Sequence, residues 1–478
     1  MMDLLDEYWL KSIQFIERLR IGRFVSFNLK CMKKSRRLFI KQISGSTAAV
    51  ALGGILPGFT AAQYKRIPGA SDRIRMAIIG TNSRGAAMAS VFARQSNTDI
   101  AFICDVEKKA LQKGIDAVTK AGQPAPAGKN DFREILSDAS VDAVYIATPD
   151  HWHAPATILA CKAGKHVYVE KPLAHNPQEG EWAIEAARKY NRVVQMGAQR
   201  RSWPLLTEGI QALHSGVIGK IHLTKCWYTN QRKPIGFGKE VPVPDGLDYE
   251  LWQGPAPRKP YRDNLIHYNW HWFWHWGTGE ALNNGTHEVD VARWGLGLHY
   301  PIAVQSSGGR YYYKGQDDWE APDTQIITFD CGESTLIWEG RSCSNFKVQG
   351  TDRGVMFYGE KGIMQTGHNG YTIFDEKGTI LQEVKSNAVI DGRNAASPNE
   401  QLDAVHVANF LESIRLSKTP NADVAIGHTS TLWVQLGNIA QRTGRTLQID
   451  STNGKILRDK AAMQYWGRSY EQGWKPIV

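Results

Sequence analysis

The chain has 478 residues, which is enough for two or three domains. Its hydrophobic fraction of 42% and charged fraction of 22% are ordinary for a soluble globular protein. Residues 1–41 hold ten Lys and Arg against four acidic residues, a surplus of six, so only about +4 of the formal net charge of +10 belongs to the rest of the chain. That charge is too small to indicate a nucleic-acid partner. The Cys residues after position 62 are odd in number and include no C-x-x-C, which argues against a disulfide framework.

A segment near the N-terminus resembles an export signal. Ser35–Lys41 reads Ser-Arg-Arg-Leu-Phe-Ile-Lys, similar to a twin-arginine signal, and the uncharged segment Gln42–Ala62 follows it. We therefore expect export of the folded protein to the periplasm by the twin-arginine (Tat) machinery, with cleavage after Ala62 and no stable membrane anchor. The alternative is that the segment stays attached as an anchor. Met32 is a natural start for such a signal, so residues 1–31 form a separate N-terminal extension if they are translated.

The first predicted strand, 75–79, runs directly into the turn Gly-Thr-Asn-Ser-Arg-Gly, and a helix is predicted from 86 to 94. Strand, glycine turn and helix form the arrangement in which helix N-terminal amides bind a dinucleotide pyrophosphate. The first glycine allows the tight turn, and the last lets the helix pack closely on the strand. An Asn replaces the middle glycine of the usual pattern, which weakens the match. The expected cofactor contacts in the turn are Gly80, Asn82, Ser83, Arg84 and Gly85.

A second strand is predicted over 99–106, and it contains Asp105, 25 positions past Gly80. An acid near this spacing binds the ribose hydroxyls of a dinucleotide. Its negative charge would repel a 2′-phosphate, which favours NAD over NADP, while Arg84 in the turn keeps NADP possible. The alternative role for Asp105 is that of a helix N-cap.

A third strand, 141–148, is followed by a stretch with two histidines and then by a helix predicted to begin at Pro155. We expect these histidines to lie in the strand-to-helix loop. Their spacing could suggest a metal, but no third group of ligands is spaced to join them, so no metal site is predicted. The residues expected to line the cofactor cleft here are Thr148, Pro149, His151 and His153.

The run Val167-Tyr168-Val169 predicts a buried parallel strand, which the sequence Glu170-Lys171-Pro172 ends. Open α/β sheets bind ligands at the carboxyl ends of their strands, which is where Lys171 lies. We expect Glu170 and Lys171 to contact the cofactor. The alternative is a solvated ion pair at a strand end.

The second half of the chain mixes strands with amphipathic helices. Segment 234–268 is rich in Pro and Gly and is interpreted as a long loop, expected to be a substrate-side lid. The run 270–276 has Trp at every second position, which suits either a packed strand or sugar binding, and His271 and Trp272 are the expected substrate contacts. The other predicted elements are helices over 177–190, 401–417 and 428–443 and strands over 192–196, 220–231, 302–313, 323–329, 334–339, 354–359 and 371–375.

Taken together, these motifs resemble the Gfo/Idh/MocA oxidoreductase family from about Arg73 to Asp450. The resemblance implies an α/β protein with an N-terminal Rossmann domain, a doubly wound parallel sheet, at 72–199. It implies a C-terminal α/β domain with a large, mostly antiparallel open sheet at 200–450, followed by a tail at 451–478. A cis Lys171–Pro172 bond, a homo-oligomer and a sugar, polyol or glycoside substrate are also implied. The residues that carry it are Gly80-x-x-x-x-Gly85, Asp105, Ala147-Thr-Pro-x-His-x-His153, Glu170-Lys-Pro172 and Gly285-Thr-His287-x-x-Asp290.

The family's chemistry implies hydride transfer between a sugar carbon and nicotinamide. His287 is the expected base, since the ordinary pKa of His suits proton transfer, and Lys171 would hydrogen-bond the same oxygen. Relatives often have an Asp four residues before this His. Here that residue is Asn283, which can orient a substrate but cannot take a proton. The remaining expected contacts are Gln199 for the cofactor and Arg200 and Asp290 for the substrate.

Three functions remain open on these grounds. The first is an exported NAD(P)-dependent oxidoreductase that acts on a sugar, polyol or glycoside hydroxyl with a tightly bound cofactor. The second is an NAD-dependent redox-assisted glycosidase or lyase, which uses the same cofactor and base. The third is a non-catalytic sugar-binding protein, which the departures at Asn82 and Asn283 favour.

Overall fold

The computed structural model describes residues 73–367, 370–386 and 400–478. The chain divides into Met1–Ser71 and Asp72–Val478, and the fold described here is that of the second unit. The predicted export signal and N-terminal extension lie outside the described residues. Within the described ranges, no helix is both long and apolar enough to cross a membrane.

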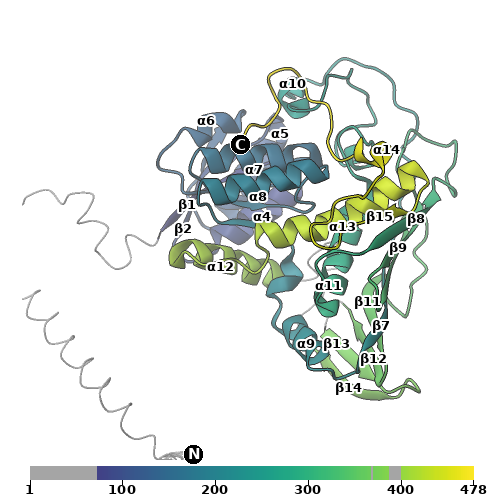
Figure 1. Cartoon of the computed structure of the whole chain (residues 1–478). Coiled ribbons are helices and arrows are strands. Elements are labelled where there is room, and N and C mark those ends of the chain that lie inside the picture. The colour runs from purple at the N-terminus through teal and green to yellow at the C-terminus, as the bar shows by residue number, and fades with distance from the viewer. Residues whose placement is uncertain (1–72, 368–369, 387–399) are drawn as a thin grey trace, which may run out of the picture. The chain divides into compact units, whose positions relative to one another are not determined.

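The N-terminal domain is built on a six-stranded parallel sheet in the order β3-β2-β1-β4-β5-β6, the doubly wound arrangement that the sequence predicts. Helices α7 and α8 pack on one face, and α4 and α5 on the other (Figure 1). The strands are β1 (Ile74–Ile79), β2 (Thr98–Cys104), β3 (Ala127–Lys129), β4 (Ala143–Ile146), β5 (His166–Val169) and β6 (Val194–Met196). The helices are α4 (Arg84–Ala93), α5 (Lys108–Lys120), α6 (Phe132–Leu136), α7 (Asp150–Lys162) and α8 (Pro177–Lys189).

Helix α7 corrects the expected loop around His151 and His153. It begins at Asp150, so both histidines lie in its first turns, and Pro155 is inside the helix. A proline there removes the amide that would bond to the carbonyl of His151. That carbonyl instead accepts a hydrogen bond from Arg468 Nη2 at 2.6 Å. This bond from Arg468, more than 300 positions later in the chain, therefore allows the helix to begin before Pro155.

The C-terminal domain contains a nine-stranded sheet in the order β14-β13-β12-β11-β7-β10-β9-β8-β15. Strands β7 and β10 pair in parallel and the other pairs are antiparallel, as expected for this domain. The sequence did not predict β12, β14 or β15. The strands are β7 (Ile221–Thr229), β8 (Ala303–Gly309), β9 (Thr324–Asp330), β10 (Thr335–Arg341), β11 (Arg353–Gly359), β12 (Gly362–Thr366), β13 (Gly370–Phe374), β14 (Ile380–Lys385) and β15 (Leu447–Gln448).

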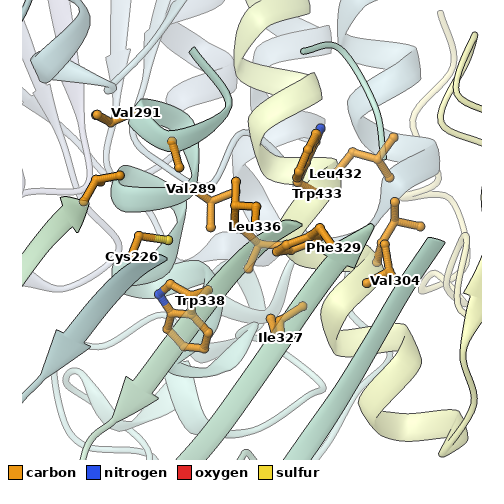
Figure 2. Packing of buried hydrophobic residues seen from close by; sticks show 14 of the residues in the cluster. Cys226, Val289, Val291, Val304, Ile327, Phe329, Leu336, Trp338, Leu432 and Trp433 are labelled. Atoms are coloured by element: carbon orange, nitrogen blue, oxygen red, sulfur yellow. The ribbon is translucent and has the colours of Figure 1, made fainter. Parts of the chain in front are cut away.

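One face of this sheet packs on α11 and α13 through alternating buried side chains (Figure 2). Phe329 and Trp433 lie 5.0 Å apart between their ring centroids, which joins β9 to α13. This packing fixes α11 and the turn before it against the sheet, where they can position polar side chains. The helices of this part are α9 (Pro204–His214), α10 (Tyr249–Gln253), α11 (Thr286–Leu296), α12 (Glu400–Leu416), α13 (Val424–Thr443) and α14 (Lys460–Met463).

Helix α12 follows strand β14 of the second sheet in sequence, but it packs on the first domain. Its residues Val407, Phe410 and Leu411 are buried in the core formed by α4 and the first sheet. The aromatic ring of Phe410 lies 5.7 Å from that of Tyr168 on β5. The chain thus returns from the second domain to the first through α12.

The aromatic run 270–276 is not a strand. It starts as a short 3-10 helix, η3 (Asn269–Trp272), and continues as a turn, so its Trp side chains do not share one face. Trp272 is buried and stacks on Trp319 with ring centroids 3.8 Å apart. Alternation of large aromatic residues is insufficient to specify a strand when each ring finds a separate tertiary partner.

Candidate active site

A cavity of about 620 Å³ lies at the carboxyl ends of the first sheet's strands, where open α/β sheets bind ligands. The first domain contributes the glycine turn and the loops that follow β2, β3, β4 and β5. The second contributes one wall of polar and aromatic side chains. Those second-domain residues are Tyr228, Asn230, Arg232, Leu247, Leu251, Trp252, His267, Tyr268, Trp270, His271, Asn283 and Asn284.

The glycine turn has the close backbone approach that a dinucleotide requires. Gly80 has φ of +83°, and a Cβ there would lie 2.7 Å from the carbonyl oxygen of Ala147. A Cβ on Gly85 would lie 1.7 Å from the carbonyl oxygen of Gly80. Asn82 turns its side chain to Lys113, whose Nζ donates to Asn82 Oδ1 at 2.6 Å. The side chain that replaces the usual glycine is therefore held by α5, and the turn keeps its compact form.

Asp105 lies beside this turn and lines the cavity. Its Oδ2 accepts a hydrogen bond from the Thr81 amide at 2.6 Å, and its Oδ1 accepts from the Glu107 amide at 3.0 Å. Burial raises the pKa of this carboxyl, while the two amides act in the opposite direction. Each carboxylate oxygen has more than one lone pair, so ribose hydroxyls can still donate to it. Asp105 thus both holds the turn and remains suited to the role predicted for it.

The loop after β4 contributes Thr148 and Pro149 to the cavity, and the start of α7 contributes His153. The hydroxyl of Thr148 is buried and has no partner among the described residues, as expected of a group that bonds a ligand. The ring nitrogens of His153 face the carbonyls of Pro172 at 2.6 Å and Thr148 at 2.8 Å. His153 therefore joins the loop after β4 to the loop after β5. His151 does not line the cavity, because its Nε2 bonds to the Trp252 carbonyl at 2.9 Å.

The glycine turn, the partly buried Asp105 and the unpartnered Thr148 hydroxyl together fit a dinucleotide. Arg84 is not available for a 2′-phosphate, because it bonds Glu170 Oε1 at 2.9 Å and Asp403 Oδ1 at 2.7 Å. It also donates to the Gln199 side-chain oxygen at 2.6 Å. Arg84, Glu170 and Gln199 thus form a support behind the turn, and Gln199 does not reach the cavity. The basis for expecting NADP is accordingly removed.

Lys171 lies where the two domains meet in the cavity. The Lys171–Pro172 peptide bond is cis, as the resemblance implies. Lys171 Nζ donates to the Asn283 carbonyl oxygen at 2.6 Å and to Asn283 Oδ1 at 3.0 Å. Burial lowers the pKa of Lys171, although Glu170 and Asp150 act to raise it. The structure therefore brings together Lys171 and Asn283, two of the three predicted catalytic residues.

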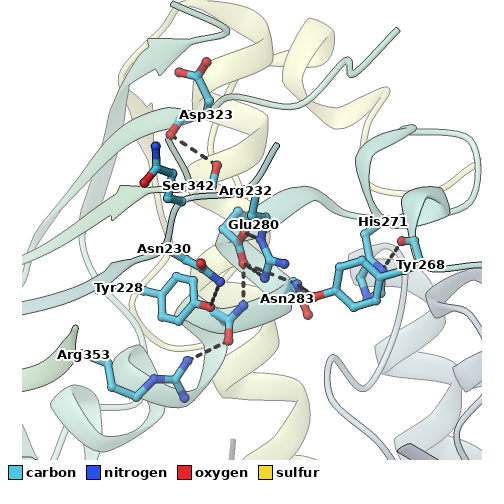
Figure 3. Close-up of polar contacts among 12 residues, drawn as sticks. Tyr228, Asn230, Arg232, Tyr268, His271, Glu280, Asn283, Asp323, Ser342 and Arg353 are labelled. Carbon is cyan, nitrogen blue, oxygen red and sulfur yellow. Dashed lines mark hydrogen bonds and ion pairs between the residues drawn. The ribbon is translucent and has the colours of Figure 1, made fainter. Parts of the chain in front are cut away.

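Asn283 belongs to a π-helical turn, η4 (Ala281–Gly285), that leads into α11. Its Nδ2 lies 3.3 Å from the hydroxyl of Tyr268 and 3.3 Å from Glu280 Oε1 (Figure 3). Glu280 also pairs with Arg232 and accepts from Asn284. Asn284 Oδ1 in turn accepts from Arg353 Nη2 at 2.6 Å. A connected set of hydrogen bonds thus fixes the amide that holds Lys171.

Four wall residues were not predicted from the sequence: Tyr228, Asn230, Arg232 and Tyr268. Glu280, which pairs with Arg232, was not predicted either. They come from the end of β7, the loop after it and the segment before η4, and no motif links them. Burial raises the pKa of the Tyr228 hydroxyl to about 12, so it stays protonated. His271 does line the cavity, as expected, and its Nδ1 bonds the Tyr268 carbonyl at 2.6 Å.

Three of the four predicted substrate contacts and the predicted base His287 do not line the cavity. Arg200 pairs with Glu288 at 3.2 Å, and Asp290 pairs with Arg201 at 2.8 Å; both pairs are buried. Trp272 is stacked on Trp319. His287 is 3% exposed, and its Nε2 has no partner within the described part of the chain. Burial, followed by the charge of Lys171, holds the pKa of His287 well below its ordinary value, so the ring is neutral. Its role as base stays a prediction.

Comparison with protein families identifies both domains. Residues 74–198 match the model described as oxidoreductase family, NAD-binding Rossmann fold, and residues 216–320 match the C-terminal alpha/beta domain of the same family. Both matched domains are those of the Gfo/Idh/MocA family of oxidoreductases, and the cofactor of the first is NAD.

Among curated proteins, a glycosyl hydrolase family 109 protein of Saccharopolyspora erythraea is 30% identical over 220 residues, which is 43% of this chain and 48% of that protein. A second glycosyl hydrolase family 109 protein, of Shewanella pealeana, is 32% identical over 33% of this chain and 38% of that protein, so both matches span less than half of the relative's length. An alpha-N-acetylgalactosaminidase of Tannerella forsythia is 28% identical over 90% of this chain and 99% of its own length.

Solved structures share the fold. The aldose-aldose oxidoreductase of Caulobacter crescentus, complexed with glycerol, has a TM-score of 0.59 at 18% identity and covers 79% of this chain and 100% of its own. The scyllo-inositol dehydrogenase of Lactobacillus casei, with bound NAD(H) and scyllo-inositol, has a TM-score of 0.58 at 19% identity. It covers 79% of this chain and 99% of its own.

Proposed function

We propose that this protein oxidises a hydroxyl of a neutral sugar or glycoside, using NAD held in the cavity. The observation that carries the proposal is the position of Lys171, an amine bound to Asn283 where the cofactor side of the cavity meets the polar wall. The substrate names of the structural neighbours, an aldose and scyllo-inositol, support a polyhydroxylated substrate. The third possibility, a non-catalytic sugar-binding protein, has less support, because Asn82 leaves the turn intact and Asn283 holds Lys171.

The cavity favours a substrate without charge. Arg232 faces it but is already paired with Glu280, and the guanidinium also lies 5.2 Å from the ring centre of Tyr268. An anionic sugar would have to compete with a buried carboxylate for this arginine. The Tyr228, Asn230 and Tyr268 side chains offer hydrogen bonds for sugar hydroxyls instead.

When bound, NAD supplies a hydride acceptor for the substrate carbon. Lys171 takes the proton of the reacting hydroxyl, because its low pKa makes the neutral amine accessible. Asn283 holds Nζ through its carbonyl and side-chain oxygens, and so leaves the remaining position on the nitrogen for the substrate. Tyr268 bonds the same amide and orients a neighbouring substrate oxygen.

A redox-assisted glycosidase is the second candidate, and the curated relatives named as glycosidases favour it. A carbonyl formed on the sugar ring acidifies the neighbouring C–H, which allows the glycosidic C–O bond to break. Water then takes the place of the leaving group, and the carbonyl returns to an alcohol, so that NAD shows no net turnover. The second acid–base group that this requires is available in the Tyr228 and Tyr268 hydroxyls.

Turnover of a panel of neutral sugars and glycosides in D₂O tests the proposal and separates the two candidates. Net oxidation yields a ketone or lactone with no deuterium at carbon. The glycosidase route yields a hydrolysed sugar with one solvent deuterium at the carbon next to the oxidised one. Absence of both products across the panel, from protein shown to contain NAD, would contradict both candidates.

The pH profile offers a separate check on Lys171. Activity should rise with pH as Lys171 loses its proton, and this rise should lie below the ordinary lysine range because burial lowers the pKa. Asp150→Asn removes a carboxylate that raises this pKa, so the rise should move to lower pH. Asp116→Asn, on the exposed side of α5, is the control and should leave the profile in place. A shift to higher pH in Asp150→Asn would contradict the assignment.

We further propose that the protein is exported by the twin-arginine route, on the strength of Ser35–Lys41. Replacing Arg36 and Arg37 by Lys should trap the precursor in the cytoplasm, whereas Lys33→Arg with the pair intact should not. Cell fractionation followed by N-terminal sequencing checks this, and the exported form should begin near Gln63. Unaltered export of the double variant would contradict the signal. The homo-oligomer stays a prediction.

A further inference from the structure

A segment of the C-terminal domain covers the loop that follows β2. We call Gly246–Trp252 the cover segment. The amide of Lys108 donates to the Gly246 carbonyl at 2.9 Å, and the amide of Asp248 donates to the Val106 carbonyl at 2.9 Å. Between these two bonds, Glu107 and Leu247 face each other as an antiparallel pair. The loop beginning at Asp105 is thus joined to the second domain by a short ladder.

Side chains reinforce this ladder. Asn130 Nδ2 donates to Asp248 Oδ2 at 3.1 Å, and His267 Nε2 lies 2.9 Å from Glu107 Oε2. The end of the cover segment is attached to α7, since Trp152 Nε1 donates to the Trp252 carbonyl at 3.1 Å. The cover segment is therefore held by the first domain, through the segments that follow β2 and β3 and through α7. It does not lie over the substrate wall alone. This corrects the expectation of a purely substrate-side lid.

The cover segment supplies apolar side chains to the end of the cavity that holds Asp105. Leu247, Leu251 and Trp252 line the cavity, and Phe132 of the first domain lines it as well. An adenine ring is flat and largely apolar on its faces, and apolar walls next to a ribose-binding acid suit it. The first domain alone would leave this end of the site without its second wall.

We propose that the cover segment is part of the NAD site: it closes over the adenosine half of NAD and must detach from Val106–Lys108 before NAD can leave. NAD is then a resident cofactor rather than a co-substrate that exchanges at each turnover, and its reduced form gives the hydride back in place, to the carbonyl of the oxidised sugar or of a second sugar that enters the same cavity. The inference rests on the NAD-binding fold and is independent of the sugar chemistry proposed above.

The geometry provides a direct test. The two hydrogen bonds flank Glu107 and Leu247, which makes them a non-hydrogen-bonded antiparallel pair, with Cα atoms typically about 4.5 Å apart. That spacing falls within the range that a disulfide bridges, about 4.4–6.8 Å. In a Glu107→Cys/Leu247→Cys variant loaded with radiolabelled NAD, release is followed during a chase with unlabelled NAD. The oxidised form should release NAD at least about tenfold more slowly than the same protein after reduction, a difference of about 1.4 kcal/mol in the barrier.

The single Cys variants are the controls for the disulfide, and they should show no difference between oxidised and reduced protein. His267→Ala should release NAD about three- to tenfold faster, since it loses a partly exposed interaction of about 1 kcal/mol. Exposed Lys239 lies on the same long connection, and Lys239→Ala should release NAD at the wild-type rate. Equal release from the oxidised and reduced double variant would overturn the proposal. Failure of the disulfide to form would also overturn it, because the two segments would then not pair in solution. A protein inactive on every sugar could still pass this test, so the two proposals fail separately.

Discussion

Replacing Lys171 by Met should reduce sugar oxidation by roughly 100- to 10,000-fold, the usual contribution of a positioned acid–base group. Met keeps most of the buried side-chain volume, but it cannot accept the substrate proton or bond the two oxygens of Asn283. The Asp105 and glycine-turn contacts are independent of Lys171, so bound NAD should be retained. Steady-state rates, measured on protein with its NAD content quantified, give the comparison.

Two variants sharpen this prediction. Lys129→Met removes a lysine whose partner Glu134 is exposed, and it should retain full activity. Lys171→Arg should fail like Lys171→Met, since a planar guanidinium cannot replace a compact ammonium between the Asn283 oxygens. A loss of less than about tenfold in Lys171→Met would exclude this residue as the proton acceptor.

Glu280→Ala should destabilise the protein by about 3–5 kcal/mol, because it removes one partner of a buried ion pair and leaves the other uncompensated. Arg232 and Glu280 are only 16% and 4% exposed, and Glu280 also accepts hydrogen bonds from Asn283 and Asn284. Loss of that anchor should also lower activity, since Asn283 holds Lys171. Urea unfolding of variant and wild type measures the stability change.

Glu339→Ala is the control, because Glu339 is 20% exposed and its two partners, Lys225 and Arg341, are 34% and 23% exposed. It should cost only about 0–1 kcal/mol, the usual value for an exposed pair. If the two variants lost the same stability, the set of bonds in Figure 3 would not be the structural anchor of the wall.

The first domain was largely predictable from the sequence, because each of its features is local. Strand, glycine turn and helix are contiguous at 74–93, and Asp105 follows at a spacing set by a single βα unit. The cis Lys171–Pro172 bond was anticipated through the family resemblance, which also placed Lys171 and Asn283 in one site, although their direct contact was not predicted. In these cases the sequence pattern and the tertiary structure depend on the same few residues.

The second domain's wall was not predictable, because its residues are far apart in the chain and ordinary in type. Arg232 meets Glu280 and the ring of Tyr268 only when the loop after β7 packs against the segment that leads into η4. Arg200 and Asp290 were predicted as substrate contacts, but each lies in a buried ion pair. The residue type alone does not distinguish a charged side chain in such a pair from one in a binding site. The π-helical turn η4 also directs Asn283 and Asn284 to the cavity, while His287 is buried.

The most direct measurement is a single turnover of the NAD-loaded protein with a sugar deuterated at the reacting carbon, followed by mass spectrometry of the extracted nicotinamide. The account predicts deuterium in the nicotinamide of the wild-type protein, and none above background in Lys171→Met at equal NAD content. Conversion of the sugar to a ketone or lactone by the wild-type protein with no deuterium in the nicotinamide would contradict the central claim that bound NAD oxidises the substrate.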